Sequence, residues 1–132
     1  THTGNPVCCA AALGNIKVIE ENKLWENAKK MGYVFEEELN KIKSKFGCVG
    51  FVCGVGMVWA LLIVKNGTEE PDPDKAFEIV RKCYEKGLML FAPVGYKGAA
   101  IKICPPLTIG EEAIREGCSV IEEAIEEVEN GN

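Results

Sequence analysis

The feature that most limits the possible folds is the apolar stretch at residues 48–64. It is rich in Val, Leu and Ile, contains Trp59, and is interrupted only by Gly50, Gly54 and Gly56. A short run of β-branched and apolar residues predicts one or two buried strands. Its longest near-continuous part, residues 55–64, is too short to span a bilayer. The rest of the chain therefore has to supply helices that cover a small sheet.

Two helices are predicted before this stretch. Asn5-Pro6 is a strong start for the first, at residues 7–20, because Asn caps helices and Pro fits the first helical position. Its first side chains are small, so a neighbouring element can approach closely. The second is predicted at residues 23–45, where apolar residues recur at steps of three and four. Its expected buried face comprises Leu24, Ala28, Met31, Phe35, Leu39, Ile42 and Phe46.

After the apolar stretch, a third helix is predicted at residues 74–85. Asn66-Gly67 marks a turn, Asp74 can cap the helix, and Gly87 can close it. A last helix, in which acidic residues far outnumber basic ones, is predicted to begin at Thr108 or Gly110. The side chains expected to face inward from these two helices are Ala76, Phe77, Val80, Cys83, Ala113, Ile114, Ile121, Ile125 and Val128.

Two more strands are predicted between these helices, at residues 88–93 and 99–104. Pro105-Pro106 ends the second, because proline cannot donate a hydrogen bond to a sheet. The order of elements predicts an α/β (α+β) sandwich. We expect a small, mostly antiparallel sheet of three to four strands covered by helices, with a long N-terminal helical segment. We expect one domain at 1–132, with helices at 1–46 and the sheet with its covering helices at 47–132.

Composition excludes several classes of function. The net charge is −5 and no basic block occurs, which argues against nucleic-acid binding and against a polybasic membrane anchor. The seven cysteines include no Cys-x-x-Cys pair, and the one histidine is His2, so no metal site is expected. Free cysteines in apolar stretches favour a reducing cytoplasm. The adjacent pair Cys8 and Cys9 is expected to consist of buried small residues.

Gly54-Val55-Gly56 is not expected to bind a dinucleotide. The third glycine of that fingerprint would fall on Trp59, and a strand follows rather than a helix. A tight bend or bulge between strand segments is the better interpretation. With one histidine, at the extreme terminus, no Ser/His/Asp catalytic set can be assembled either.

Two segments carry more information. Residues 1–13, THTGNPVCCAAAL, resemble the T-x-x-G-N-P-x-x-x-A-A-A-L stretch of class III aminotransferases, which depend on pyridoxal phosphate (PLP). Residues 101–109, IKICPPLTI, resemble the family's I-R-x-x-P-P-L-x-I segment. Between them, Gly54 and Gly56 lie where the family has R-G-x-G-L, and Gly87-Leu88 matches its E-x-G-L-L. The order and spacing agree over essentially the whole chain.

The resemblance implies a cofactor, partners and two site residues. In the family, PLP forms a Schiff base with a lysine of a large domain and acts as an electron sink. The enzyme is a homodimer with its active sites at the subunit interface. Thr1 aligns with the threonine that hydrogen-bonds the PLP phosphate of the partner subunit. Lys102 aligns with the arginine that grips the substrate carboxylate, and Cys53 replaces the arginine of R-G-x-G. Lysine is a point charge rather than a planar fork, so an ω-amino substrate is as plausible as an α-amino acid. A lysine on an exposed strand face, without such a role, is the other interpretation of Lys102.

The catalytic groups of the family have no counterpart here. The Schiff-base lysine, the Asp at the pyridine nitrogen and the glycine-rich loop belong to the large domain. Because the chain begins inside a motif, we expect a fragment, the C-terminal small domain, that is inactive alone. The expected parent transfers an amino group from an amino acid or amine to a 2-oxo acid. A racemase or aminomutase of the same family, and a stand-alone non-catalytic interaction domain, remain alternatives.

Overall fold

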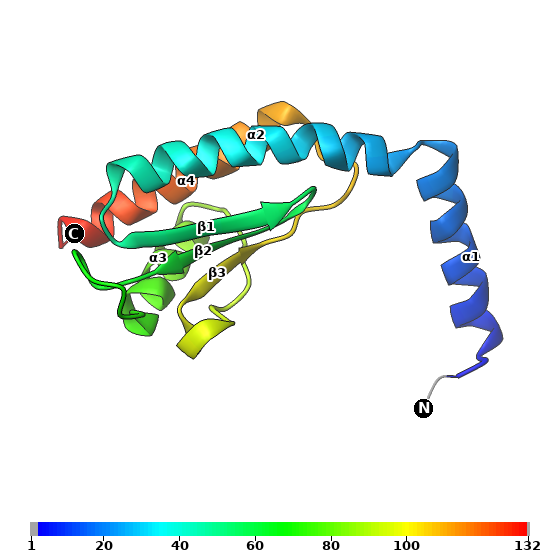
Figure 1. The fold of residues 1–132 in the computed structure, drawn as a ribbon. Coiled ribbons are helices and arrows are strands. Elements are labelled where there is room, and N and C mark those ends of the chain that lie inside the picture. The colour runs from blue at the N-terminus through cyan, green and yellow to red at the C-terminus, as the bar shows by residue number, and fades with distance from the viewer. Residues whose placement is uncertain (1–2, 132) are drawn as a thin grey trace.

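The sheet forms as the apolar stretch predicts. In the computed structural model, which describes residues 3–131, β1 (Val49–Val55) and β2 (Val58–Ile63) form a hairpin. β3 (Ala100–Ile103) adds to the free side of β2, which gives the order β1-β2-β3 with every pairing antiparallel. The sheet register shifts by a bulge between Val49 and Phe51. The predicted small antiparallel α/β sandwich is confirmed (Figure 1).

The two glycines of the hairpin are required by close packing. A Cβ atom on Gly54 would lie 2.3 Å from the Trp59 ring, so no larger residue fits without a shift of the ring. Gly56 turns the chain with φ +58°, and its backbone approaches α2 (Leu24–Lys45) so closely that a Cβ on Gly32 would lie 3.0 Å away. Trp59 Nε1 donates to the Gly56 carbonyl at 2.9 Å. The predicted tight bend is confirmed, and its cause is a helix and an indole packed against the turn.

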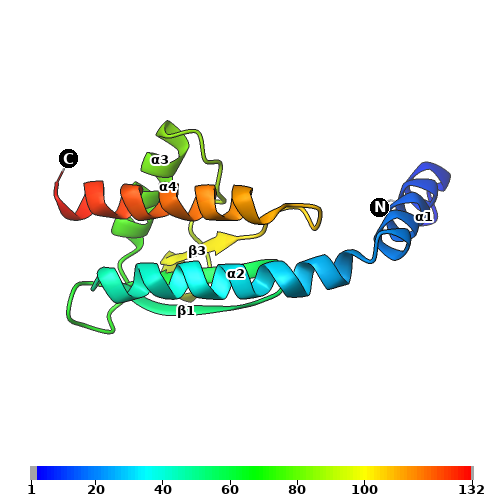
Figure 2. The ribbon, with the colours of Figure 1, turned by 90° about the horizontal axis from the view of Figure 1, so that it is seen from above.

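Three helices cover one face of the sheet. α2 lies over β1, and α4 (Glu111–Glu129) packs between α2 and α3 (Pro73–Glu85), as the view from above shows (Figure 2). The core between helices and sheet is apolar throughout, and no charged or polar residue among the described ones is buried. Its fully buried large side chains include Leu39, Ile42, Leu61, Ile63, Ile79, Ile101, Ile114 and Ile125.

The first helix stands apart from this body. α1 (Pro6–Glu21) begins where Asn5 accepts hydrogen bonds from the amides of Val7 and Cys8, as predicted. At Lys23, with φ +47°, the chain turns into α2. All of α1 lies within the described residues, and none of its side chains is buried. It projects away from the sheet and the other helices (Figure 1). Cys8 and Cys9 are therefore exposed, and the prediction that they are buried is wrong for this chain by itself.

Three other predictions are corrected. Residues 88–93 are not a strand, although Val94 makes an isolated bridge to Ala100. Phe77 is 58% exposed, because the buried stripe of α3 runs through Ala76, Ile79 and Cys83 and leaves Phe77 on the outer side. Ala113 is exposed, because α4 turns its Ile114 and Cys118 to the core.

The predicted cap of the third helix is also wrong, by two residues, whereas the cap of the last helix is one of the two predicted. α3 is capped by Asp72, whose side chain accepts from the Lys75 amide at 3.0 Å, rather than by Asp74. Asp74 instead occupies the first turn, and Pro73 takes the first helical position. For α4, Gly110 rather than Thr108 is the cap residue.

Candidate functional site

The face of the sheet opposite the helices is uncovered in this chain. Side chains alternate between the two faces of a strand, so every second residue points to this open side. The sheet register places Cys53, Ala60 and Lys102 side by side in one row across the three strands. The neighbouring row contains Phe51, Leu62 and Ala100. We call these two rows, together with Val55, Val58 and Cys104, the open face.

The open face is apolar apart from one charge. Phe51 is 55% exposed and Val55 is 82% exposed, whereas the alternating residues Trp59, Leu61 and Ile103 are buried against the helices. Among the strand residues of the open face, Lys102 is the single charged side chain. Uncovered apolar surface of this kind marks a contact site.

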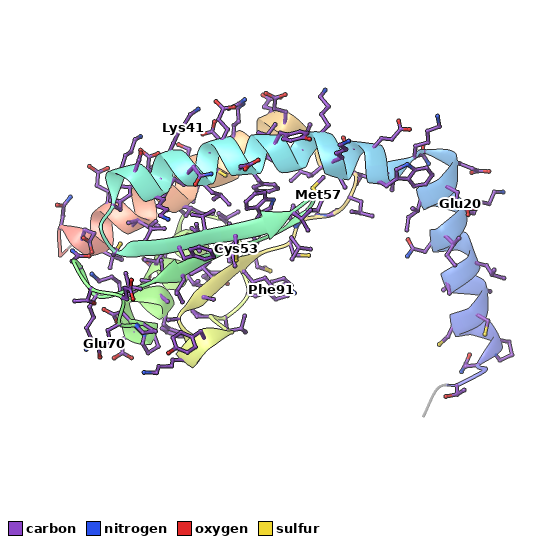
Figure 3. The ribbon with its side chains drawn as sticks, viewed as in Figure 1. Glu20, Lys41, Cys53, Met57, Glu70 and Phe91 are labelled. Carbon is purple, nitrogen blue, oxygen red and sulfur yellow. The ribbon has the colours of Figure 1, made fainter. Side chains whose placement is uncertain are left out.

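Lys102 is held by an aromatic side chain rather than by an acid. Its Nζ lies 5.5 Å from the centroid of the Phe91 ring, a distance typical of a cation–π contact. No ion pair to Lys102 is present within the described residues. Phe91 comes from the loop beside β3 (Figure 3). The ammonium group is thus positioned by a neutral partner and keeps its capacity to bind an anion.

The loop that carries Phe91 leaves a pocket along the free edge of β3. The pocket has a volume of about 120 Å³, and its walls come from the segment at residues 88–91, from β3 and from α4. Phe35, Ile114, Cys118 and Ile121 form its apolar interior, and Lys102 lines it as the one charged residue. Sequence reasoning missed Phe91 and this pocket, because it placed residues 88–93 in the sheet, where they would close the edge.

The segment after β3 is fixed to α2. The Asn27 side-chain amide donates to the Leu107 carbonyl at 2.7 Å and to the Ile109 carbonyl at 3.1 Å. These bonds hold the chain that follows Pro105-Pro106 against the start of α2. The end of β3, and with it Lys102, is therefore placed on a fixed support.

Comparison with known proteins identifies the family. The family model for class III aminotransferases matches residues 1–125. The chain belongs to the class III aminotransferase family. It is 35% identical over 128 residues to 5-aminovalerate aminotransferase DavT of Pseudomonas putida. The aligned region covers 97% of this chain and 30% of that protein. It is 38% identical over 132 residues to the leucine/methionine racemase of Thermococcus litoralis, covering 99% of this chain and 29% of the racemase.

Solved structures of class III relatives share the fold. A transaminase from the marine bacterium Virgibacillus superposes with a TM-score of 0.89 at 32% identity, covering 99% of this chain and 30% of that one. The chain thus spans about 30% of the length of the relatives that it matches. Within the described residues, the helices are too short or too polar to cross a membrane, and no cluster of potential metal ligands occurs there.

Class III aminotransferases are PLP-dependent, and the described residues can be tested against that cofactor. A Schiff-base lysine needs a lowered pKa, from an apolar pocket or a neighbouring cation. Here a hydrogen-bonded glutamate raises the pKa of Lys41, Lys65 and Lys86. Burial acts to lower the pKa of Lys75, but the hydrogen bond and charge of Glu129 outweigh it and raise the pKa. None of these four lysines fits a Schiff base.

The N-terminus of α1 offers no phosphate site within the described residues either. The Asn5 side chain already accepts the amides of Val7 and Cys8, which a phosphate would otherwise use. Thr1, to which the family resemblance assigns the phosphate contact, lies outside the described residues, as does His2. Neither these four lysines nor the start of α1 therefore forms a PLP site by itself.

Proposed function

We propose that this chain acts as the C-terminal small domain of a PLP-dependent aminotransferase. The match to the family over residues 1–125 carries this proposal, together with the 30% share of the relatives' length that the chain spans. The complete enzyme would move an amino group from an amino acid or amine to a 2-oxo acid. PLP would be held by a large domain of the same polypeptide, and Thr1 would contact the PLP phosphate of the partner subunit.

In this proposal Lys102 binds the carboxylate of the substrate. Its place in the family's carboxylate-binding motif supports this role, as does its position as the one charge on the open face. The large domain and a second subunit would cover the open face and α1, whose exposed apolar side chains include Val7, Leu13 and Ile16. The free, reduced cysteines are consistent with a cytoplasmic enzyme.

The cofactor arm of the proposal is tested by locating the Schiff base. The polypeptide that contains this chain would be purified with PLP, reduced with borohydride and mapped by mass spectrometry. We expect the pyridoxyl group on a lysine outside residues 1–132. A pyridoxyl-lysine inside this chain would overturn the small-domain proposal.

The substrate arm is tested by steady-state kinetics with matched lysine variants. Lys102→Met should raise KM for carboxylate substrates about tenfold and Lys102→Arg should restore it, because a charged hydrogen bond is lost and regained. Lys43→Met is the control, since Lys43 also lies over an aromatic ring, at 5.6 Å from Phe51. Equal effects of Lys102→Met and Lys43→Met would refute the role of Lys102.

A second candidate function is amino-acid racemisation. The observation that favours it is the 38% identity to a leucine/methionine racemase, which covers 99% of this chain. The two functions differ in their need for an acceptor. A racemase converts one enantiomer of an amino acid into the other without a 2-oxo acid, whereas an aminotransferase forms a new amino acid only when a 2-oxo acid is present.

The role of Thr1 is tested by titrating the complete enzyme with PLP. Thr1→Ala should weaken PLP binding, and Thr1→Ser should retain it because the hydroxyl donor remains. Thr3→Ala serves as the matched control two residues away. Unchanged PLP affinity in Thr1→Ala would remove the assignment.

A further inference from the structure

The chain exposes more surface than its mass requires. Its accessible surface is 8120 Å² at a mass of 14.4 kDa. A compact monomer of this mass exposes about 6,800 Å², so the excess is about 1,300 Å². A specific protein–protein contact buries about 800 Å² on each partner. The excess is therefore large enough to be the area that this chain presents to a partner.

α1 contributes one part of this excess. None of its side chains is buried, although residues 6–14 include no charged side chain. Cys9, Leu13, Ile16 and Glu20 follow one another at steps of four, three and four, so they form one stripe along the helix. Leu13 is 68% exposed and Ile16 is 51% exposed. A helix with such apolar side chains is normally packed against protein.

The open face contributes another part, and its dimensions match those of α1. The seven residues of β1 extend over about 23 Å, and the sixteen residues of α1 extend over about 24 Å. The outer two of the three strands lie about 10 Å apart, which is also the diameter of a helix. One helix of this length can therefore cover the open face from end to end.

The charges of the two surfaces are complementary. The strands place one cation, Lys102, on the open face. The stripe of α1 ends in Glu20, close to the C-terminus of the helix, where the helix dipole is negative. Lys17 pairs with Glu21 at 3.7 Å rather than with Glu20. An α1 helix on the open face would therefore bring its acidic end to a surface whose strand residues carry a positive charge.

The helix that covers the open face cannot be the chain's own α1. α1 and α2 are joined by Asn22 and Lys23, and the chain from Glu21 to Leu24 spans at most about 11 Å. α2 lies on the other side of the sheet, so a helix on the open face would be two layers of about 10 Å away from it. The joint is too short for α1 to lie flat along its own sheet, and α1 stands apart from the sheet in both views (Figure 1, Figure 2).

A second copy of the chain removes this restriction. Each chain contains both surfaces, so two copies can exchange their helices about a two-fold axis and cover both open faces at once. We propose that this chain dimerises in this way, with α1 of each copy on the open face of the other. This dimer lies outside the proposed amino transfer, because it needs only the 132 residues. Fixing the direction of α1 costs free energy, so we expect a dissociation constant of about 10–100 μM.

Sedimentation of the 132-residue chain tests the dimer. At about 500 μM we expect about twice the mass of 14.4 kDa, and at about 1 μM we expect the monomer. Phe51→Lys, on the open face, should weaken the dimer about tenfold or more, because a charge would have to be buried. Phe77→Lys is the matched control, since Phe77 is exposed to a similar extent but lies on α3. Circular dichroism verifies that both variants fold.

A photo-crosslink identifies the surfaces that meet. Ile16→benzoylphenylalanine would be irradiated in a mixture of ¹⁴N- and ¹⁵N-labelled chains and mapped by mass spectrometry. We expect crosslinks from position 16 of one copy to β1, β2 or β3 of the other. Ile16→Lys should weaken the dimer as Phe51→Lys does, because both changes place a charge in the same contact.

The dimer is refuted if the chain is monomeric at the higher concentration, or if Phe77→Lys weakens it as much as Phe51→Lys. Crosslinks within one chain, or to the helices of the other copy, would refute the exchange of α1. These outcomes leave the proposed amino transfer intact, because that proposal is tested by the position of the pyridoxyl-lysine. Conversely, a pyridoxyl-lysine inside this chain would refute the small-domain proposal and leave the dimer intact.

Discussion

The two faces of the sheet come from the same three strands and differ in almost every physical respect. The covered face presents Trp59, Leu61, Ile101 and Ile103 to three helices and excludes water. The open face presents apolar residues together with Lys102, and Phe51 and Val55 on it remain 55% and 82% exposed. One face is therefore explained by the stability of this chain. The other is not needed for the packing of this chain, which makes it the candidate surface for contact with the rest of the proposed enzyme.

The largest difference between the two sides should appear in thiol reactivity. Burial raises the pKa of Cys48 to about 11 and that of Cys83 and Cys118 to about 12. Relative to a pKa of 9, these values lower the reactive thiolate fraction about 100- to 1000-fold at neutral pH. In a DTNB assay at pH 7.5 we expect the four exposed thiols, Cys8, Cys9, Cys53 and Cys104, to react quickly. Denaturant should release the other three, and seven fast thiols in the folded chain would contradict the core.

The next largest effect should come from a pair of neighbouring leucines. Leu61 is fully buried on the covered face, so Leu61→Ala should lower the free energy of unfolding by about 2–5 kcal/mol. Leu62 points to the open face and is only half-buried, so Leu62→Ala should cost about 1 kcal/mol or less. Urea unfolding followed by circular dichroism measures both. Equal costs would mean that the open face is also packed in solution.

A smaller effect should come from the hairpin glycine that faces the helices. Gly54→Ala places a Cβ against the Trp59 ring and should cost about 1–3 kcal/mol through overpacking. Gly47→Ala is the control, because a Cβ at Gly47 would meet no atom within 4 Å. The fluorescence of Trp59 should change in the first variant only. An unchanged stability of Gly54→Ala would contradict the close packing of the turn.

The smallest effect should come from the ion pair between Lys75 of α3 and Glu129 at the end of α4. Glu129 accepts from Lys75 at 2.6 Å and from Asn66 at 2.7 Å. Burial acts to raise the pKa of Glu129, but these hydrogen bonds and the charge of Lys75 outweigh it and lower the pKa. A lowered carboxyl pKa stabilises the fold above the unfolded value of 4.5, and this stability is lost as pH falls through the folded value.

Glu129→Gln should therefore flatten the loss of stability below pH 4.5 and cost about 1 kcal/mol at pH 7. Glu126→Gln, at an exposed position of the same helix, is the matched control. Urea unfolding at pH 3.5, 4.5 and 7 measures the difference. If the two variants show the same pH dependence, the ion pair does not couple α3 to α4 in solution.

The covered face could be predicted from the sequence and the open side could not. Helical periodicity found α2, and the run of β-branched residues found β1 and β2, because each pattern reports directly on a local geometry. Residues 88–93 have the composition of a strand, but a strand also needs a neighbouring strand in register. Here the pairing with β3 is limited to the next residue, Val94, which bridges to Ala100. Phe77 and Cys8 were misplaced for a related reason, since burial depends on which other elements cover a helix. The row of Cys53 and Lys102 needed the register of three strands, which no single segment encodes.

The turn at Lys23 has a geometric consequence for the residues at the start of the chain. With a rise of 1.5 Å per residue, the sixteen residues of α1 form an arm about 24 Å long. A change of 10° in the angle at Lys23 would displace Asn5 by about 4 Å, more than the length of a hydrogen bond. The phosphate contact proposed for Thr1 would therefore require that the direction of α1 be held to within a few degrees. That accuracy has to come from whatever lies along the sides of the arm.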